Sequence, residues 1–290
     1  MNFSVIVPTY NRLELLKKTL ESLLSQNYEG FEIIVVNDGS TDGTHEFLSR
    51  LSRESRIRYV CQPNSGLAAS RRAGLEIARG RYVAFTDDDC VTPPDWLQKF
   101  DRHFQGEQIA GVGGSALTGN PANLFAAAND MINEYFKSAV NYSGVLLPFL
   151  TGNNISYSRE FLNGVGGPDS RFRMGAEDRD LLLRVVSAGG TVTYDPAIAV
   201  VHHNDSNFLS FVKHQYHQGK GSHLYYTLHR QTALRPRRFS SAVYRGLLAR
   251  PFKSNPFPKA LAFFCLIILA QCAVLSGYVA AALAGDPGNQ

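Results

Sequence analysis

The first hundred residues alternate short apolar runs with segments of helical periodicity. Four runs have the length and the apolar content of buried strands: Phe3–Pro8, Glu32–Val36, Arg56–Cys61 and Tyr82–Thr86. Three amphipathic segments separate them: Leu13–Leu24, Thr44–Leu51 and Leu67–Ala78. This alternation predicts an α/β fold with a mostly parallel sheet flanked by helices. Ligands of such sheets bind beyond the carboxyl ends of the strands, so the loops that follow the strands form the candidate site.

The regular pattern loosens beyond residue 110. Further elements are expected in this order: a strand at Gly111–Leu117, a helix at Ala122–Ala139, a loop that leads into a strand within Thr151–Tyr157, a helix within Gly175–Gly190, and strands at Thr191–Tyr194 and Ala197–Val201. Glu177 and Asp178 lie in the favourable N-terminal turn of the second helix, and Gly189 ends it.

Three consecutive carboxylates, Asp87, Asp88 and Asp89, follow the run Tyr82–Thr86. Acids this close repel one another strongly in a medium of low dielectric unless a cation lies among them. A divalent metal that carries phosphate oxygens is the usual partner, so the triplet predicts a site for Mg²⁺ or Mn²⁺ and a nucleotide. A solvated turn is the alternative interpretation.

The loops after the first two strands carry further polar side chains. Pro8, Thr9, Tyr10 and Asn11 follow the first run, where backbone groups and an aromatic ring could hold a base or a ribose. Asp38 follows the second run and could accept a hydrogen bond from a nucleobase, although a turn with a helix cap explains its loop equally well.

Four other polar residues have two interpretations each. Arg71 could reach a diphosphate or belong to a solvated basic face. Asp178, beside Glu177, could be the general base that a displacement at a sugar requires, or both could be ordinary charges of a helix start. His202 ends a strand and could contact a metal or phosphate, or be structural.

Charge and hydropathy divide the chain unevenly. Residues 1–205 carry a net charge of −5, and the remainder carries +9. The uncharged stretch Ala260–Gly285 is long enough to cross a bilayer, and the arginines and lysines before it predict that the preceding domain is cytoplasmic. A buried helix of a soluble protein is the alternative. Binding of nucleic acid by the basic tail is not expected.

The beginning of the sequence and its cysteines indicate the same compartment. No basic leader precedes the first apolar run, so we expect the first domain to fold in the cytosol. The four cysteines form no CxxC pair, which disfavours a disulfide framework or a zinc site. Reduced thiols are therefore expected.

Six segments together resemble one known family. In chain order they are SVIVPTYNR, IIVVNDGSTDGT, NSGLAASRRAG, YVAFTDDD, TGNNISYSR and GAEDRDLLLRVVSAG, and they resemble the family 2 glycosyltransferases over Asn2–His203. The resemblance implies a GT-A fold, which is Rossmann-like, and inverting transfer of a sugar from a nucleotide sugar, usually UDP-linked, to an acceptor. It also implies a metal cofactor, Mg²⁺ or Mn²⁺.

The resemblance also implies roles for the residues that match the family's motifs. On the donor side these are Pro8, Thr9, Tyr10, Asn11, Asp38, Arg71, Asp87 and Asp88. Asp89 matches the metal ligand, and His202 occupies a place where some relatives contact metal or diphosphate. Asp178 matches the catalytic base. On the acceptor side the matches are Gly152, Asn153, Asn154 and Glu177.

One departure from the family narrows the expectation. Processive members carry a QxxRW motif after the catalytic base, but here the comparable region is HQYHQGKGS, so a single or limited addition is preferred.

We expect a catalytic domain at 1–229, a basic juxtamembrane linker at 230–259 and a transmembrane or anchoring helix at 260–285. The expected acceptor is a glycan or lipid-linked molecule of cell-envelope or exopolysaccharide synthesis at the inner (plasma) membrane. A polyprenyl-phosphate glycosyltransferase or a nucleotidyltransferase is the alternative.

Overall fold

The computed structural model describes residues 1–53, 56–105, 109–139, 141–142, 145–146, 150–173, 175–232 and 240–285. It divides them into two compact units. The first comprises Met1–Gly119, Leu150–Arg173 and Glu177–His203. The second comprises the described parts of Asn120–Phe149, Met174–Ala176 and Asn204–Gln290.

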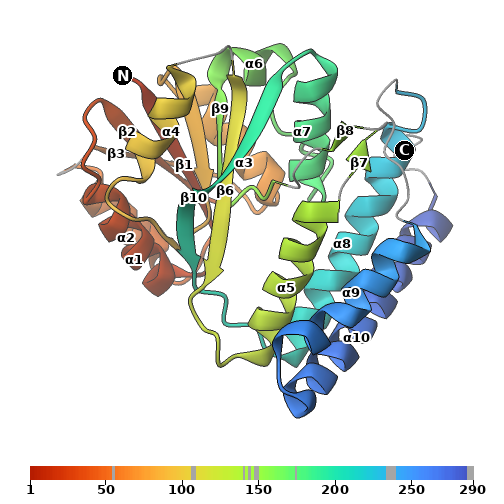
Figure 1. The fold of residues 1–290 in the computed structure, drawn as a ribbon. Coiled ribbons are helices and arrows are strands. Elements are labelled where there is room, and N and C mark those ends of the chain that lie inside the picture. The colour runs from red at the N-terminus through yellow and green to blue at the C-terminus, as the bar shows by residue number, and fades with distance from the viewer. Residues whose placement is uncertain are drawn as a thin grey trace. The chain divides into compact units, whose positions relative to one another are not determined.

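A sheet of eight described strands forms the centre of the first unit (Figure 1). In spatial order the strands are β3 (Ile57–Cys61), β2 (Phe31–Asn37), β1 (Phe3–Thr9), β4 (Tyr82–Thr86), β9 (Asn154–Ser158), β6 (Ile109–Thr118), β10 (Thr191–His202) and β5 (Cys90–Val91). Strands β3, β2, β1 and β4 are mutually parallel, as are β6 and β10. Strand β9 is antiparallel to both of its neighbours, and β5 is antiparallel to β10. The predicted mostly parallel sheet is confirmed.

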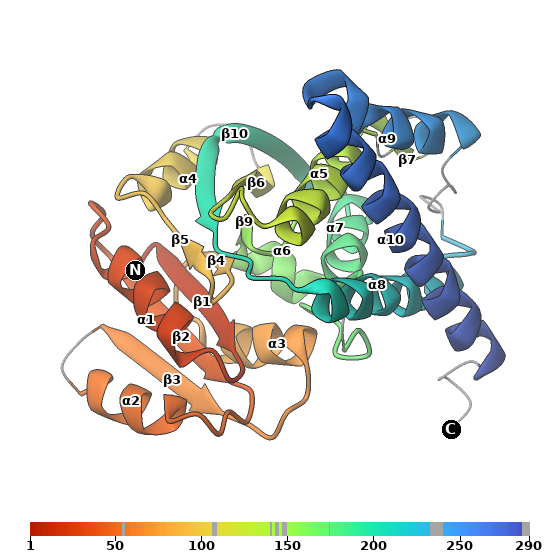
Figure 2. The same cartoon turned by 90° about the horizontal axis from the view of Figure 1, so that it is seen from below.

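Helices cover both faces of this sheet (Figure 2). One apolar core contains residues of α1 (Leu13–Leu24), α2 (Thr44–Leu51) and α4 (Trp96–Phe104), and the other contains residues of α3 (Leu67–Ile77), α6 (Arg159–Gly164) and α7 (Glu177–Ser187). Val5 and Val7 face the first core, whereas Ile6 between them faces the second. Because side chains alternate across a strand, a continuous apolar run such as β1 is buried on both sides.

The expected elements of the first hundred residues form within one residue of their predicted bounds, but the prediction for Thr191–Val201 differs from the structure. Strand β10 is one continuous strand rather than two, and its pairing with β6 shifts register between Asp195 and Ala199, around Pro196. Because Pro196 has no N–H to donate to the neighbouring strand, the sequence predicts two strands with a break between them. The structure has only an irregularity at this point of one strand. Strand β5 and helix α4 were not expected from the sequence.

The second unit is built mainly of helices: α5 (Leu124–Ala139), α8 (Phe208–Leu228), α9 (Ser241–Ser254) and α10 (Phe257–Leu283), with two short strands, β7 (Asn141–Tyr142) and β8 (Val145–Leu146). Its core contains Ile132, Phe211, Leu247 and Ile267, one from each helix. Helix α8 was not expected, and α9 lies inside the segment 230–259 that the sequence predicts to be a linker. Residues 233–239 of that segment lie outside the described residues.

Helices α8 and α10 meet through two glycines. A Cβ added at Gly219 would lie 2.8 Å from the carbonyl carbon of Val274, and one at Gly277 would lie 2.9 Å from that of Tyr216. Larger side chains at these positions would therefore separate the two helices. Helix α10 is long and apolar enough to cross a membrane, as the sequence predicts. One side of it is packed within the unit, whereas Leu261, Ile268 and Leu275 are exposed.

Candidate active site

The loops after β1 and β2 are joined by the backbone and side chain of Asn11. Its N–H donates to Ser40 Oγ at 2.9 Å, and its Oδ1 accepts from the Thr41 N–H at 2.7 Å. Asn11 has a φ of +53°, a region that asparagine tolerates better than most residues. Pro8 is buried at the end of β1, and Tyr10 is exposed beside Asn11. The structure therefore places these predicted donor-side residues at one strand-end edge.

Asp38 orders the loop that follows β3. Its Oδ1 accepts hydrogen bonds from Gln62 Nε2 at 2.7 Å and from the Ser65 N–H at 2.9 Å, and its Oδ2 accepts from the Gly66 N–H at 2.9 Å. The carboxylate is buried. Asp38 is thus fixed at the strand-end edge by three donors, which explains its place in the sequence without a ligand. Its contact with a nucleobase stays a prediction.

The middle residue of the acidic triplet is held by the loop after β1. Thr9 Oγ1 donates to Asp88 Oδ2 at 2.7 Å, and Arg12 Nη1 lies 3.2 Å from Asp88 Oδ1. Burial raises the pKa of Asp88 to about 6, because the attraction of Arg12 only partly offsets the loss of solvent. The triplet is therefore a folded turn with its second carboxylate inside, rather than a solvated turn.

Asp89 is brought to His202 by the pairing of β5 with β10. His202 lies opposite Cys90 in that antiparallel pair, and the His203 N–H donates to the Asp89 carbonyl at 2.8 Å. Asp89 Oδ1 lies 3.3 Å from His202 Nε2, and Arg12 Nη1 lies 2.8 Å from its Oδ2. Burial opposes ionisation of Asp89, but the hydrogen bond and charge of His202 and the charge of Arg12 hold its pKa below the usual value.

Asp89, Cys90 and His202 form a possible metal site, with ligand atoms that lie within 4.8 Å of one another. A carboxylate oxygen and an imidazole nitrogen suit Mn²⁺, and a carboxylate also suits Mg²⁺. Burial raises the pKa of the Cys90 thiol well above its ordinary value, and a neutral thiol is a poor ligand. The donor set therefore fits a hard divalent ion held by Asp89 and His202.

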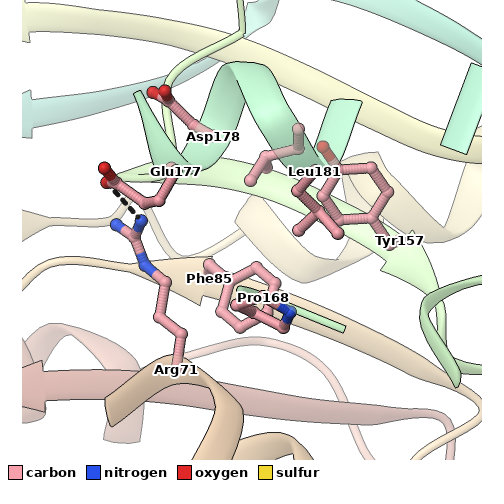
Figure 3. Close-up of a pocket in the computed structure, with 9 residues that line it drawn as sticks. Arg71, Phe85, Tyr157, Pro168, Glu177, Asp178 and Leu181 are labelled. Carbon is pink, nitrogen blue, oxygen red and sulfur yellow. Dashed lines mark hydrogen bonds and ion pairs between the residues drawn. The ribbon is translucent and has the colours of Figure 1, made fainter. Parts of the chain in front are cut away.

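Arg71 joins the first residue of the triplet to helix α7, and Figure 3 shows its contact with Glu177 on that helix. Its Nη2 donates to Asp87 Oδ1 at 2.8 Å, and its Nη1 donates to Glu177 Oε1 at 3.1 Å. The guanidinium is buried and lies over the Phe85 ring, 5.8 Å from its centroid. The structure thus brings three predicted site residues together, with a buried cation between two acids. A contact of Arg71 with base or diphosphate stays a prediction.

Glu177 and Asp178 lie above a small, mainly apolar cavity (Figure 3). Its volume of about 10 Å³ has room for one water molecule but not for a sugar. Burial is the main cause that raises the pKa of both carboxyls, and the charge of Asp178 adds to the effect on Glu177. Asp178 Oδ1 accepts a hydrogen bond from the Arg179 N–H at 2.8 Å.

Gly152 and Asn153 precede β9, Asn154 is its first residue, and the three differ in what surrounds them. A Cβ added at Gly152 would lie 2.6 Å from Arg71 Cζ, so only glycine leaves room for that guanidinium. Asn153 accepts a hydrogen bond from Thr151 Oγ1 at 2.7 Å. Asn154 is buried and points into the core, where it donates to the Ser115 and Ile198 carbonyls and accepts from Trp96 Nε1. The structure accounts for Asn154 without a ligand, and its acceptor-side role stays a prediction.

Sequence reasoning missed Arg12 and Cys90. Arg12 occupies the N-cap of α1 without a capping hydrogen bond from its side chain. A cation is unfavourable at the positive end of a helix, and arginine is not a preferred cap, so its position could have indicated an acidic partner. Cys90 directly follows the triplet, but nothing in its sequence position shows that it lies opposite His202 in the pairing of β5 with β10.

Comparisons with known proteins indicate one family. The model of glycosyl transferase family 2 matches residues 4–166. An uncharacterized glycosyltransferase of Nostoc is 30% identical over 171 residues, 57% of this chain and 53% of that protein. A putative teichuronic acid biosynthesis glycosyltransferase, TuaG of Bacillus subtilis, is 43% identical over 98 residues, 33% of this chain and 39% of that protein. The matched segments thus span about half or less of these relatives.

Solved structures share the fold at low sequence identity. A mannosyltransferase from Pyrobaculum calidifontis, in complex with GDP-Man and Mn²⁺, has a TM-score of 0.69 at 17% identity, over 98% of this chain and 88% of that one. S. aureus TarS 1–349, in complex with UDP-GlcNAc, has a TM-score of 0.57 at 16% identity, over 96% and 89%. The expected GT-A-like α/β fold is confirmed.

Proposed function

The chain belongs to glycosyl transferase family 2, and from this premise we propose that it moves a sugar from a nucleotide sugar, preferentially a UDP-sugar, to an acceptor hydroxyl with inversion at the anomeric carbon. The observation that carries the proposal is the convergence of all three acids of the triplet with cations and with α7 at one edge of the sheet. Arg71 pairs with both Asp87 and Glu177, Arg12 pairs with both Asp88 and Asp89, and His202 lies beside Asp89. This arrangement suits a substrate with both a diphosphate and a sugar.

On the donor side, the residues around Asn11 and Asp38 would hold the nucleoside. Their loops are cross-linked by hydrogen bonds, which supports a preformed surface. Asp89 and His202 would hold Mg²⁺ or Mn²⁺, which when bound offsets the charge that develops on the departing nucleoside diphosphate. The solved relatives support this assignment, since one contains GDP-Man with Mn²⁺ and another contains UDP-GlcNAc.

Asp178 would act as the general base. The Arg179 N–H orients its carboxylate, and burial raises its pKa, which strengthens its affinity for the proton of an acceptor hydroxyl. Its neighbour Glu177 is tied to Arg71 instead. Removal of the proton by Asp178 would accompany attack of the acceptor oxygen on the anomeric carbon, opposite the departing diphosphate, and the configuration would invert.

The acceptor and location are proposed from the second unit and the relatives. The exposed apolar side of α10 and the basic residues of α9 suit the cytoplasmic face of an inner membrane, with residues 1–229 as the catalytic domain, 230–259 as the juxtamembrane segment and 260–285 as the anchor. TuaG, named for teichuronic acid biosynthesis, supports a lipid-linked or polysaccharide acceptor in envelope synthesis.

A panel of UDP- and GDP-sugars tests the proposal. With Mn²⁺ and membrane lipid extract, we expect release of the nucleoside diphosphate from one preferred donor. Asp178→Asn should bind that donor in a thermal-shift assay but lose transfer by about 10²-fold or more, because general-base catalysis contributes that much. Asp101→Asn on α4 is the matched control and should retain activity. Failure of every nucleotide sugar to yield diphosphate would contradict the function.

A polyprenyl-phosphate acceptor is the second candidate, favoured by the apolar exposed side of α10. A phosphate oxygen is already ionised and needs no base. Full turnover by Asp178→Asn on a polyprenyl phosphate, together with loss of turnover on hydroxyl acceptors, would establish that alternative.

A further inference from the structure

The guanidinium of Arg12 lies among the residues proposed to hold the metal. One guanidinium nitrogen, Arg12 Nη1, lies 3.2 Å from Asp88 Oδ1 and 2.8 Å from Asp89 Oδ2. The remaining Asp89 oxygen, Oδ1, faces His202 Nε2 at 3.3 Å. Both oxygens of Asp89 are thus engaged, and a metal bound there meets the Arg12 charge within a few ångströms.

The two carboxylates need a positive partner. The side chains of Asp88 and Asp89 are each 6% exposed, and buried adjacent acids are costly unless a cation compensates them. A guanidinium supplies one charge, whereas a divalent ion supplies two and coordinates directly. Because the two cations also repel each other, occupation of the carboxylates by the metal disfavours Arg12 in its present position.

Arg12 can leave without disturbing the fold. Its side chain is 50% exposed, and it makes no capping hydrogen bond to α1. The first N–H of that helix, on Leu13, is satisfied by Asp42 Oδ2 at 2.9 Å. The start of α1 therefore does not depend on the guanidinium, and a rotation of the side chain towards solvent breaks only its contacts with the triplet.

We propose that Arg12 is an exchangeable counter-ion: it compensates Asp88 and Asp89 while the metal is absent, and it yields them when the divalent ion binds. The inference rests on the metal site of the proposed function. Arg12 is then a positioning residue. It holds the two carboxylates in place and ionised for the metal, but it also competes with the metal for them. Removing its charge therefore has opposite effects on metal affinity and on metal-free stability.

The test measures binding of Mn²⁺ alone to the full chain in mild detergent, by the EPR signal of free Mn²⁺. We expect Arg12→Gln to bind Mn²⁺ about tenfold more tightly than the wild type, since a competing charge is gone. Arg12→Lys keeps the charge and should stay near the wild type. Arg50→Gln removes an exposed arginine of α2 and should leave the affinity unchanged, whereas Asp89→Asn should abolish binding.

Thermal unfolding supplies the second measurement. Without metal, Arg12→Gln should unfold at a lower temperature than the wild type, and saturating Mn²⁺ should close that gap. Equal or weaker Mn²⁺ affinity in Arg12→Gln, with binding still dependent on Asp89, would overturn the exchange and leave the metal site standing. Absence of Mn²⁺ binding in every variant would overturn both the exchange and the metal site.

Discussion

Arg71 and Arg12 both donate to the acidic triplet, but the side chain of Arg71 is 4% exposed and that of Arg12 is 50% exposed. Arg71 lies between acids of β4's loop and α7, with Gly152 closing the space around it. Arg12 reaches the triplet from the loop before α1, and half of its side chain is exposed. The ion pairs of Arg71 are therefore buried and fixed, whereas those of Arg12 can break when its side chain rotates into solvent.

Replacing Arg71 should have the largest effect on stability. Arg71→Met keeps much of the side-chain volume but leaves Asp87 and Glu177 without their cation, and loss of one partner from a buried ion pair costs about 3–5 kcal/mol. Urea unfolding should show this loss. Arg72→Met is the matched control, because its exposed guanidinium pairs with Glu76 at the i,i+4 spacing and makes one long contact, of 3.4 Å, with the Gly166 carbonyl. This variant should cost less than about 0.5 kcal/mol. Equal losses in the two variants would show that Arg71 is not part of a rigid frame.

The space around Arg71 can be tested separately from its charge. Gly152→Ala places a Cβ 2.6 Å from Arg71 Cζ, so the guanidinium or the loop must shift, and overpacking of this kind costs about 1–3 kcal/mol. At Gly164 an added Cβ meets nothing within 4 Å, so Gly164→Ala is the control and should not destabilise. Transfer activity should fall in the first variant alone. A fully active, equally stable Gly152→Ala would mean that Arg71 is as movable as Arg12.

The sequence predicts the strand-end loops better than it predicts the contact of Asp89 with His202, and the reason is physical. The helices and strands of the first hundred residues follow from local periodicity, and the loops after β1, β2 and β4 meet because parallel strands end at one edge. The contact of Asp89 with His202 depends on the pairing of β5 with β10, which joins segments more than a hundred residues apart. Neither strand's own pattern specifies its partner.

Helix α8 was missed for a related reason. It carries polar residues around much of its circumference, and Gly219 and Gly221 lower its helical propensity, so periodicity gives little signal. Its glycines are explained by the close approach to α10, where the backbones touch at Gly219 and Gly277. A contact of this kind is visible only once both helices are placed.

The last prediction concerns the protonation of Glu177, the acid of α7 that pairs with Arg71. Burial raises the pKa of Glu177 above its value in the unfolded chain, so the folded state binds this proton more tightly. The stability that results is fully present below the ordinary pKa of about 4.3 and is lost as the pH rises through the raised value. Glu177→Gln cannot ionise and should lose less stability over that interval. Denaturant unfolding from pH 4 to 8 measures the difference in slope, with Glu76→Gln at an exposed position of α3 as the control. Parallel pH profiles for the wild type and Glu177→Gln would mean that Arg71 fully compensates the ionised carboxylate.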